Sequence, residues 1–179
     1  MLDSGMWVFG YGSLIWNPGF GYIERCIARL DGWQRSFCMR SLHHRGTREA
    51  TGLVLALDQV SGSACFGVAF RVAPGQVEET LQTLRERELI SSAYLEHWLP
   101  VTLANGKKEN ALTYVINPGH DQYCGGLALE DQAQIIARAK GGKGTNREYL
   151  FSTAGHLTEL GIADPDLDWL VTRVVELPT

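Results

Sequence analysis

Near its start the chain carries an apolar run that breaks into two glycines on either side of a tyrosine, followed by a serine. Residues 7–9 (Trp-Val-Phe) favour β-structure and predict a buried strand. Gly10 and Gly12 lack side chains, so backbone N–H groups can turn towards a ligand that approaches closely, and Ser13 adds a hydroxyl. The pattern indicates a ligand-binding loop, although a tight turn after a core strand would use the same residue types.

A carboxylate stands out on the first predicted helix, residues 76–90. At about 100° per residue, Val77, Leu81 and Leu84 share one stripe, Glu88 falls in its middle and Glu86 falls on the opposite side. A carboxylate on a core-facing stripe is costly unless it is paired or opens into a cavity where it acts. Glu88 is therefore a candidate acid or base, and the alternative is an ordinary charged helix end.

Composition limits the classes of protein and of partner. With 179 residues and 45% hydrophobic content, we expect a single domain spanning residues 1–179. The formal net charge of −4 and the absence of a basic stripe predict no nucleic-acid partner and no binding to an anionic membrane. Neither a signal-peptide pattern nor a membrane-spanning apolar run is present, which predicts a cytoplasmic protein.

Cysteine and histidine spacing argues against a metal site. Cys26, Cys38, Cys65 and Cys124 form no Cys-x-x-Cys pair and are expected to be reduced, mostly in the core. The adjacent histidines His43 and His44 lack the i, i+4 spacing by which two histidines on a helix bind one metal ion. We expect no structural metal.

The order of predicted elements favours an α+β fold. Hairpins are predicted between strands 22–30 and 33–39 at Asp31-Gly32, between 51–57 and 64–72 across residues 58–63, and between 94–102 and 108–116 at Asn105-Gly106. Later helices are predicted at residues 129–139, from the Thr145/Glu148 capping box to Leu160, and after Asp164-Pro165. Strands followed by helices indicate a curved, mostly antiparallel sheet or small β-barrel with flanking helices.

From Trp7 to the C-terminal helix the chain resembles the ChaC-type, glutathione-specific γ-glutamylcyclotransferases. The most specific match is residues 8–16, Val-Phe-Gly-Tyr-Gly-Ser-Leu-Ile-Trp, which resembles the loop that binds glutathione. Further matches follow in the family's order: His44-Arg45-Gly46, Arg87-Glu88 and Asn146-Arg147-Glu148-Tyr149-Leu150.

The resemblance implies a γ-glutamyl cyclotransferase-like fold and a lyase activity without a cofactor. Glutathione would be converted to 5-oxoproline and L-cysteinylglycine by attack of the α-amine on the γ-carbonyl. Because nucleophile and electrophile share one molecule, the protein would mainly position the substrate and move protons, and one carboxylic acid can serve both proton transfers if burial raises its pKa. The resemblance makes Glu88 the general acid/base and assigns substrate binding to Val8, Phe9, Gly10, Tyr11, Gly12, Ser13, Leu14, Arg45 and Tyr149.

Three alternatives stay open. Residues 85–88 contain two Arg-Glu pairs, so a slip of two positions would make Glu86 the acid, although the helical stripe and the interval to Tyr94 favour Glu88. The substrate could be another γ-glutamyl amino acid or amine. A non-catalytic regulator linked to cation transport would bind glutathione without converting it. No obligate protein partner is implied.

Overall fold

The computed structural model describes residues 5–179, and their contacts group into two compact units. The first unit holds the described residues up to Arg35 together with Leu57–His120, and the second holds Ser36–Ala56 and Asp121–Thr179. Each unit is therefore built from segments that are distant in the sequence.

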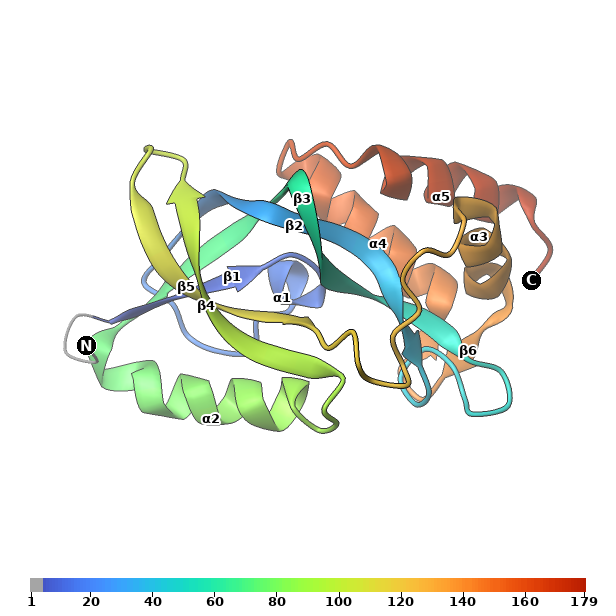
Figure 1. The fold of residues 1–179 in the computed structure, drawn as a ribbon, viewed down its shortest axis with the longest axis horizontal. Helices are drawn as coiled ribbons and strands as arrows, with labels where there is room; N and C mark the ends of the chain where they lie inside the picture. Colours follow the sequence, from blue (N-terminus) through green and yellow to red (C-terminus); the bar gives the residue numbers. More distant parts are fainter. Residues whose placement is uncertain (1–4) are drawn as a thin grey trace. The chain divides into compact units, whose positions relative to one another are not determined.

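Five strands close into a barrel in the order β1-β3-β2-β4-β5, which confirms the predicted fold class (Figure 1). β1 pairs antiparallel with β3, where Val8 lies opposite Phe70, and parallel with β5, where Val8 lies opposite Leu112. β4 and β5 form the predicted antiparallel hairpin. The strands span Met6–Gly10 (β1), Glu24–Ser41 (β2), Gly52–Val72 (β3), Tyr94–Leu103 (β4) and Lys108–Ile116 (β5).

Two predicted hairpins are wrong, because β2 and β3 are each one long strand. β2 runs without a turn through Asp31-Gly32, and β3 runs through residues 58–63. The favoured two-residue hairpin turn needs positive φ at both central residues. Gly32 has a φ of +82°, but no described residue other than glycine has a positive φ, so Asp31 does not complete such a turn. The glycine is accommodated inside an extended strand instead.

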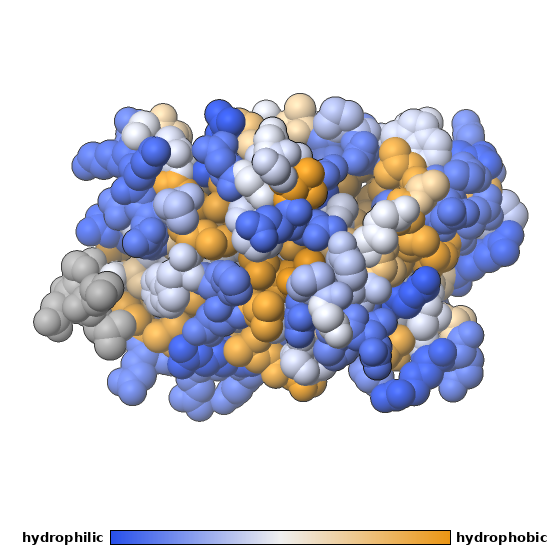
Figure 2. Space-filling view, in the orientation of Figure 1, coloured by the Kyte–Doolittle hydropathy of each residue, from blue (hydrophilic) through white to orange (hydrophobic). Residues whose placement is uncertain are grey.

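Helix α2 (Val77–Glu88) covers part of the barrel in the first unit. Its Val77 and Leu84 are buried in one cluster with Val8, Val72 and Leu112. A short 3₁₀ turn, Pro74–Gln76, precedes it, and Leu89 follows as its C-cap, so the predicted boundaries shift by one or two residues. Hydrophilic side chains lie along the outer side of α2 (Figure 2). A four-residue helix, α1 (Ser13–Trp16), follows β1.

Three helices pack against one another in the second unit: α3 (Leu129–Arg138), α4 (Asn146–Glu159) and α5 (Pro165–Glu176). The predicted caps are confirmed, because Thr145 and Glu148 form a capping box on α4 and the Asp164 carboxylate accepts a hydrogen bond from Leu167 N–H on α5. The small strands β6 (Lys140–Gly141) and β7 (Gly144–Thr145) pair between α3 and α4.

Across residues 5–179, no helix combines the length and apolar character needed to cross a membrane.

Candidate functional site

The loop after β1 offers its backbone rather than its side chains. Val8, Phe9, Tyr11 and Leu14 are at most 7% exposed and belong to the core clusters of the first unit. Ser13 is the half-buried exception. In the described part of the chain, the N–H groups of residues 12–14 donate no hydrogen bond to another backbone carbonyl. These amides can therefore serve an oxygen of a ligand.

A buried arginine holds this loop from the barrel side. Arg35 on β2 is 5% exposed, and its Nε donates a hydrogen bond of 2.6 Å to the Tyr11 carbonyl while Nη2 donates to the Phe66 carbonyl. A trans peptide directs its C=O and N–H to opposite sides, so fixing the Tyr11 carbonyl also fixes the Gly12 N–H. A Cβ at Gly67 would lie 2.3 Å from the Gly10 carbonyl oxygen, so β3 approaches the loop as closely as only glycine allows.

The Tyr11 side chain holds the loop from the other direction. Its hydroxyl donates a buried hydrogen bond of 2.7 Å to the Tyr114 carbonyl on β5. Tyr11 was predicted to bind substrate, but its side chain lies in the core with its hydroxyl bonded to β5. Only its backbone is part of the loop surface.

The two candidate carboxylates of α2 lie in different surroundings. Glu88 is the last residue of the helix, and its side chain is 15% exposed. Glu86 is exposed and accepts a hydrogen bond from Gln82 on its own helix, 2.9 Å long. Helical spacing along α2 therefore distinguishes the half-buried Glu88 from the exposed Glu86.

Arg87 links Glu88 to the loop. Its Nε lies 3.1 Å from Glu88 Oε1, and its Nη2 donates to Ser13 Oγ at 3.0 Å. Its Nη1 donates to the carbonyls of Asn17 at 2.6 Å and Pro18 at 3.3 Å. The Arg87 guanidinium therefore places a positive charge directly beside the Glu88 carboxylate.

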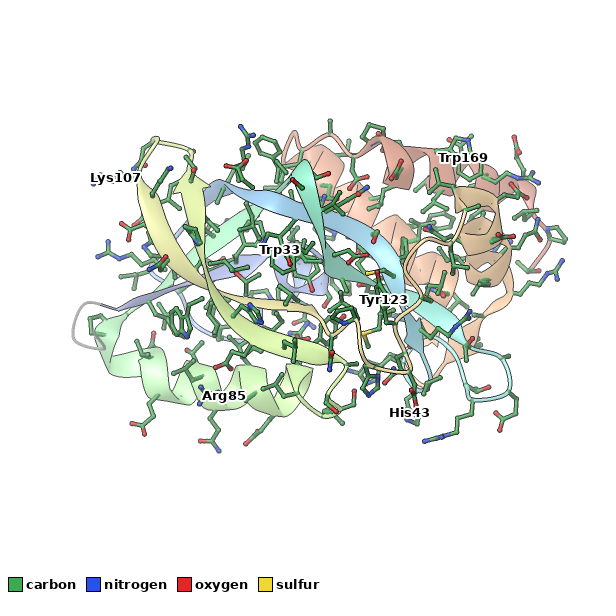
Figure 3. All side chains as sticks on the ribbon, in the orientation of Figure 1. Trp33, His43, Arg85, Lys107, Tyr123 and Trp169 are labelled. Carbon is green, nitrogen blue, oxygen red and sulfur yellow. The ribbon has the colours of Figure 1, made fainter. Side chains whose placement is uncertain are left out.

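A tyrosine and a second carboxylate lie beside this arrangement. Tyr114 donates to Glu96 Oε2 at 3.1 Å, and Arg85 forms a two-point ion pair with Glu96, with N–O distances of 2.9 and 2.8 Å. Arg85 is labelled on α2 in Figure 3. Burial raises the pKa of Tyr114, and the charges of Glu96 and Glu88 raise it further. The Arg85 hydrogen bonds hold the pKa of Glu96 below its usual value. Tyr114 therefore stays a protonated donor at neutral pH.

Arg45 and Tyr149 meet in the second unit. The Arg45 guanidinium carbon lies 5.6 Å from the centre of the Tyr149 ring, and Nη1 donates to the Thr145 carbonyl at 3.2 Å. Only 13% of the Arg45 side chain is exposed, so it is not a solvated loop arginine. The Tyr149 hydroxyl oxygen accepts a hydrogen bond from Leu55 N–H at 3.3 Å.

An open cleft elsewhere in the first unit contains none of the predicted site residues. It lies between the segment after α1 and the first turns of α2, and it is lined by Gly19, Phe20, Gly21, Gln76, Glu79, Thr80 and Thr83. The described residues contain no group of three or more His, Cys, Asp or Glu side chains that could hold a metal ion.

The sequence analysis assigned no role to Arg35, Arg87, Glu96 or Tyr114, although Arg87 is part of the matched Arg87-Glu88 pair. Arg35 shares the inward parity of β2 with Phe37 and Met39, which are buried. A charged residue at a core-facing position is the same signal that identified Glu88, and it would have identified Arg35. The partners of Arg87 and Tyr114 come from distant segments, so no local pattern indicates them.

Comparisons with known proteins agree on one family. The family described as ChaC-like protein matches residues 6–177. A glutathione-specific γ-glutamylcyclotransferase of Escherichia coli K12 is 39% identical over 176 residues, covering 98% of this chain and 75% of the relative. A protein with the same description from Schizosaccharomyces pombe is 34% identical over 182 residues, covering 92% of this chain and 89% of the relative.

Solved structures extend the likeness to the fold. A crystal structure of a yeast γ-glutamyl cyclotransferase specific to glutathione superposes with a TM-score of 0.86. It is 26% identical in sequence, and the superposition covers 98% of each chain.

Proposed function

The chain belongs to the ChaC family, and from this membership we propose that it is a glutathione-specific γ-glutamylcyclotransferase, a lyase that converts glutathione to 5-oxoproline and L-cysteinylglycine. One structural observation supports a specific location for the reaction. The half-buried Glu88 carboxylate is tied through Arg87 to a loop in which the N–H groups of residues 12–14 have no backbone acceptor among residues 5–179. That arrangement supplies a proton carrier and oxygen-binding donors in one place.

The reaction needs positioning more than it needs a protein nucleophile. The nitrogen of the α-amine in the γ-glutamyl residue forms a bond to its own γ-carbonyl carbon, and the bond from that carbonyl carbon to the cysteine nitrogen breaks. No water is consumed and no group is transferred to the protein. Holding amine and carbonyl in attack geometry replaces an encounter between two molecules, which is worth roughly 7–11 kcal/mol in favourable intramolecular systems.

In this proposal, Glu88 carries the proton. Its carboxylate accepts a proton from the attacking nitrogen as the new C–N bond forms, and the resulting acid returns one to the cysteine nitrogen as the old bond breaks. The neighbouring Arg87 charge supports the starting carboxylate. The low exposure of the Glu88 side chain supports the return step, because burial costs the neutral acid less hydration than it costs the carboxylate.

The loop amides are assigned to the charge that develops on oxygen. When the amine attacks, the γ-carbonyl oxygen becomes negative, and donors already aimed at that position stabilise it without reorganising. The N–H groups of residues 12–14 are suited to this role or to binding the substrate α-carboxylate. Losing one such donor typically costs about 3 kcal/mol of transition-state stabilisation.

The roles of Arg45 and Tyr149 stay predictions. The family resemblance assigns both to orienting substrate carboxylates, and arginine is suited to two-point carboxylate contacts. Tyr149→Phe removes the hydroxyl and keeps the ring that lies beside Arg45. If Tyr149 orients the substrate, this variant raises KM, whereas an unchanged KM would refute the assignment.

We also propose that the enzyme works in the cytoplasm without an obligate protein partner. No disulfide joins any of the four cysteines, all of which lie in the described part of the chain. The absence of disulfides is typical of a reducing compartment. Turnover by the purified chain alone would support the absence of a partner, and cell fractionation tests the location.

The test is a product assay with two matched variants. Purified wild type is incubated with reduced glutathione, and 5-oxoproline and cysteinylglycine are followed by mass spectrometry beside Glu88→Gln and Glu86→Gln. We expect both products from the wild type and from Glu86→Gln, and a loss of about 10²–10⁴-fold in kcat for Glu88→Gln with substrate binding retained. If Glu86→Gln is the inactive variant, the acid is misassigned while the activity stands.

The substrate is tested separately with γ-glutamylalanine. Cyclisation of that compound with glutathione left intact would keep the chemistry and refute the substrate. Glutathione that binds and survives, with no turnover of other γ-glutamyl compounds, would favour the regulatory alternative.

A further inference from the structure

In the proposed function, on which this inference rests, catalysis requires a fixed separation between Glu88 and the loop after β1. They belong to different elements, since Glu88 ends α2 while the loop joins β1 to α1. Proton transfer and oxygen binding must act on the same substrate molecule. Catalytic groups need to be held within about 0.5 Å of the productive geometry, so a side chain that spans both elements has a direct effect on rate.

Arg87 spans them with three nitrogen atoms of one planar group. Nε lies beside Glu88, Nη2 donates to Ser13, and Nη1 donates to the Asn17 carbonyl. The longer contact of Nη1 to Pro18 adds to the hold on the chain that leaves α1. Because the guanidinium is rigid, movement of one partner relative to another must break or distort a contact.

We propose that Arg87 is a positioning residue that sets the Glu88 carboxylate relative to the substrate loop. It acts through Glu88 and Ser13 rather than by touching the reacting atoms. A lysine in its place would carry the same charge but only one compact ammonium, which cannot hold the Glu88 carboxylate, the Ser13 hydroxyl and the Asn17 carbonyl in one plane.

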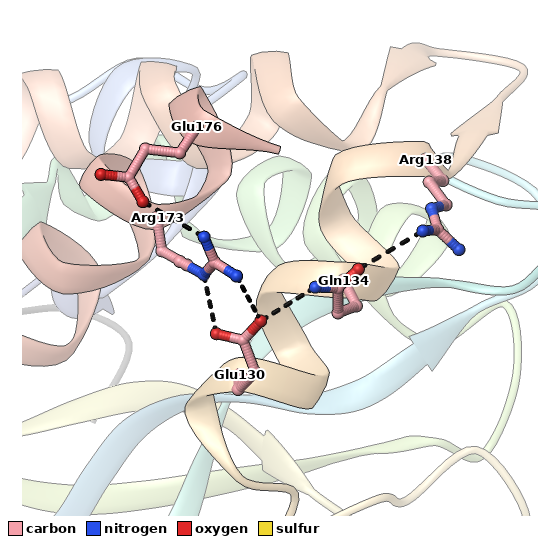
Figure 4. A network of polar contacts seen from close by, with 5 residues as sticks. All are labelled: Glu130, Gln134, Arg138, Arg173 and Glu176. Carbon is pink, nitrogen blue, oxygen red and sulfur yellow. Dashed lines mark hydrogen bonds and ion pairs between the residues drawn. The ribbon is translucent and has the colours of Figure 1, made fainter. Parts of the chain in front are cut away.

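The second unit offers a matched control in Arg173 of α5 (Figure 4). Its Nε and Nη2 donate to the two oxygens of Glu130 at 2.8 and 2.9 Å, and its Nη1 donates to Glu176 at 3.2 Å. Arg173 therefore matches Arg87 in charge and in the number of nitrogen atoms that make contacts, but all its partners here are surface side chains. Exposed ion pairs of this kind contribute little to the stability of the fold. Arg173→Ala removes the same guanidinium group as Arg87→Ala, but it touches neither the substrate loop nor Glu88.

The experiment measures kcat and KM for glutathione with wild type, Arg87→Ala, Arg87→Lys and Arg173→Ala. We expect Arg87→Ala to lose about 100-fold in kcat, the cost of a small misplacement of catalytic groups, with KM changed less than about threefold. Arg87→Lys should stay at least about tenfold below wild type in kcat. Arg173→Ala should match the wild type.

Chemical rescue supplies a second readout. The Arg87 side chain is 26% exposed, so its removal leaves a space open to solvent. Millimolar guanidinium should restore part of the kcat of Arg87→Ala, whereas methylammonium at equal ionic strength should not. Circular dichroism and thermal melting establish that each variant is folded, and if Arg87→Ala is not, Arg87→Lys decides by the same kcat criterion.

The outcomes separate this inference from the proposed function. A wild type that turns over no γ-glutamyl compound overturns the proposed function and this inference with it. An active wild type with Arg87→Ala equal to Arg173→Ala overturns the positioning role alone. A loss confined to KM also overturns it, because Arg87 would then contribute only uniform substrate binding.

Discussion

Replacing Asn146 by alanine tests how the second unit joins helix α4 to strand β3. Asn146 is fully buried, and its amide group pairs with the backbone of one β3 residue. Its Oδ1 accepts from Leu53 N–H at 2.7 Å, and its Nδ2 donates to the Leu53 carbonyl at 2.8 Å. Alanine leaves both backbone groups of Leu53 without these partners.

The expected cost follows from that count. A buried donor or acceptor that loses its partner costs about 1–3 kcal/mol, so two of them predict a loss of about 2–6 kcal/mol. Natural domains have unfolding free energies of about 5–15 kcal/mol, so the variant should be close to unfolded at the lower end of that range. Asn146→Asp should be no better, because its second oxygen would face the Leu53 carbonyl.

Asn117 provides the control because it is half-buried and makes the same two kinds of hydrogen bond where they are exposed to solvent. Its Nδ2 donates to the Ser92 carbonyl at 3.0 Å, and its Oδ1 accepts from Gly119 N–H at 3.1 Å. Water can replace the lost group there, so Asn117→Ala should cost less than about 1 kcal/mol.

Urea unfolding of both variants and the wild type, followed by circular dichroism, measures the difference from the midpoints at constant m. Equal losses for the two variants would refute the argument that burial of the Asn146 pair sets its cost.

Three further predictions concern charges and the loop. Arg35→Met frees the Tyr11 carbonyl and should lower kcat/KM for glutathione by about 10–100-fold; an unchanged value would show that the loop is held without it. The raised pKa of Tyr114 means that the unfolded chain ionises this tyrosine first, near 10.0. Its contribution to stability is therefore present below that pH and lost as pH rises, and Tyr114→Phe should flatten the alkaline fall measured in urea unfolding. The Arg173 hydrogen bonds hold the pKa of Glu130 at about 2, below the reference value of 4.5, so the pair is complete above pH 4.5 and is lost as pH falls towards 2. NMR titration should move the Glu130 midpoint back towards 4.5 in Arg173→Ala, and an unmoved midpoint would contradict the assignment.

Local signals in the sequence predicted the helices and their ends well. The Thr145/Glu148 capping box and the Asp164 cap use atoms three residues apart, so the sequence around them contains the whole interaction. The same holds for the stripe on α2, because helical spacing alone separates Glu88 from Glu86. The barrel and the glycine loop were likewise accessible from strand patterns and from the family resemblance.

Strand continuity was decided by tertiary structure. Asp31-Gly32 has the composition of a hairpin turn, yet β2 continues through it, because pairing with neighbouring strands stabilises an extended chain there. Turn propensity is a weak local preference, and the ladder of backbone hydrogen bonds outweighs it. No property of residues 31–32 alone reveals which strand lies alongside.

By itself, the sequence determined the class of fold, the helix caps, the candidate carboxylate and the family, since each depends on residues that are neighbours along the chain or on motif order. Only the tertiary structure decided which side chains hold the loop after β1 and which side chain joins α4 to β3. Arg87 meets Ser13 across 74 positions of sequence, Arg35 meets Tyr11 across 24, and Asn146 meets Leu53 across 93. Such contacts depend on how distant segments fold together, because a hydrogen bond requires atoms within about 3 Å and correct alignment, which spacing along the chain does not encode.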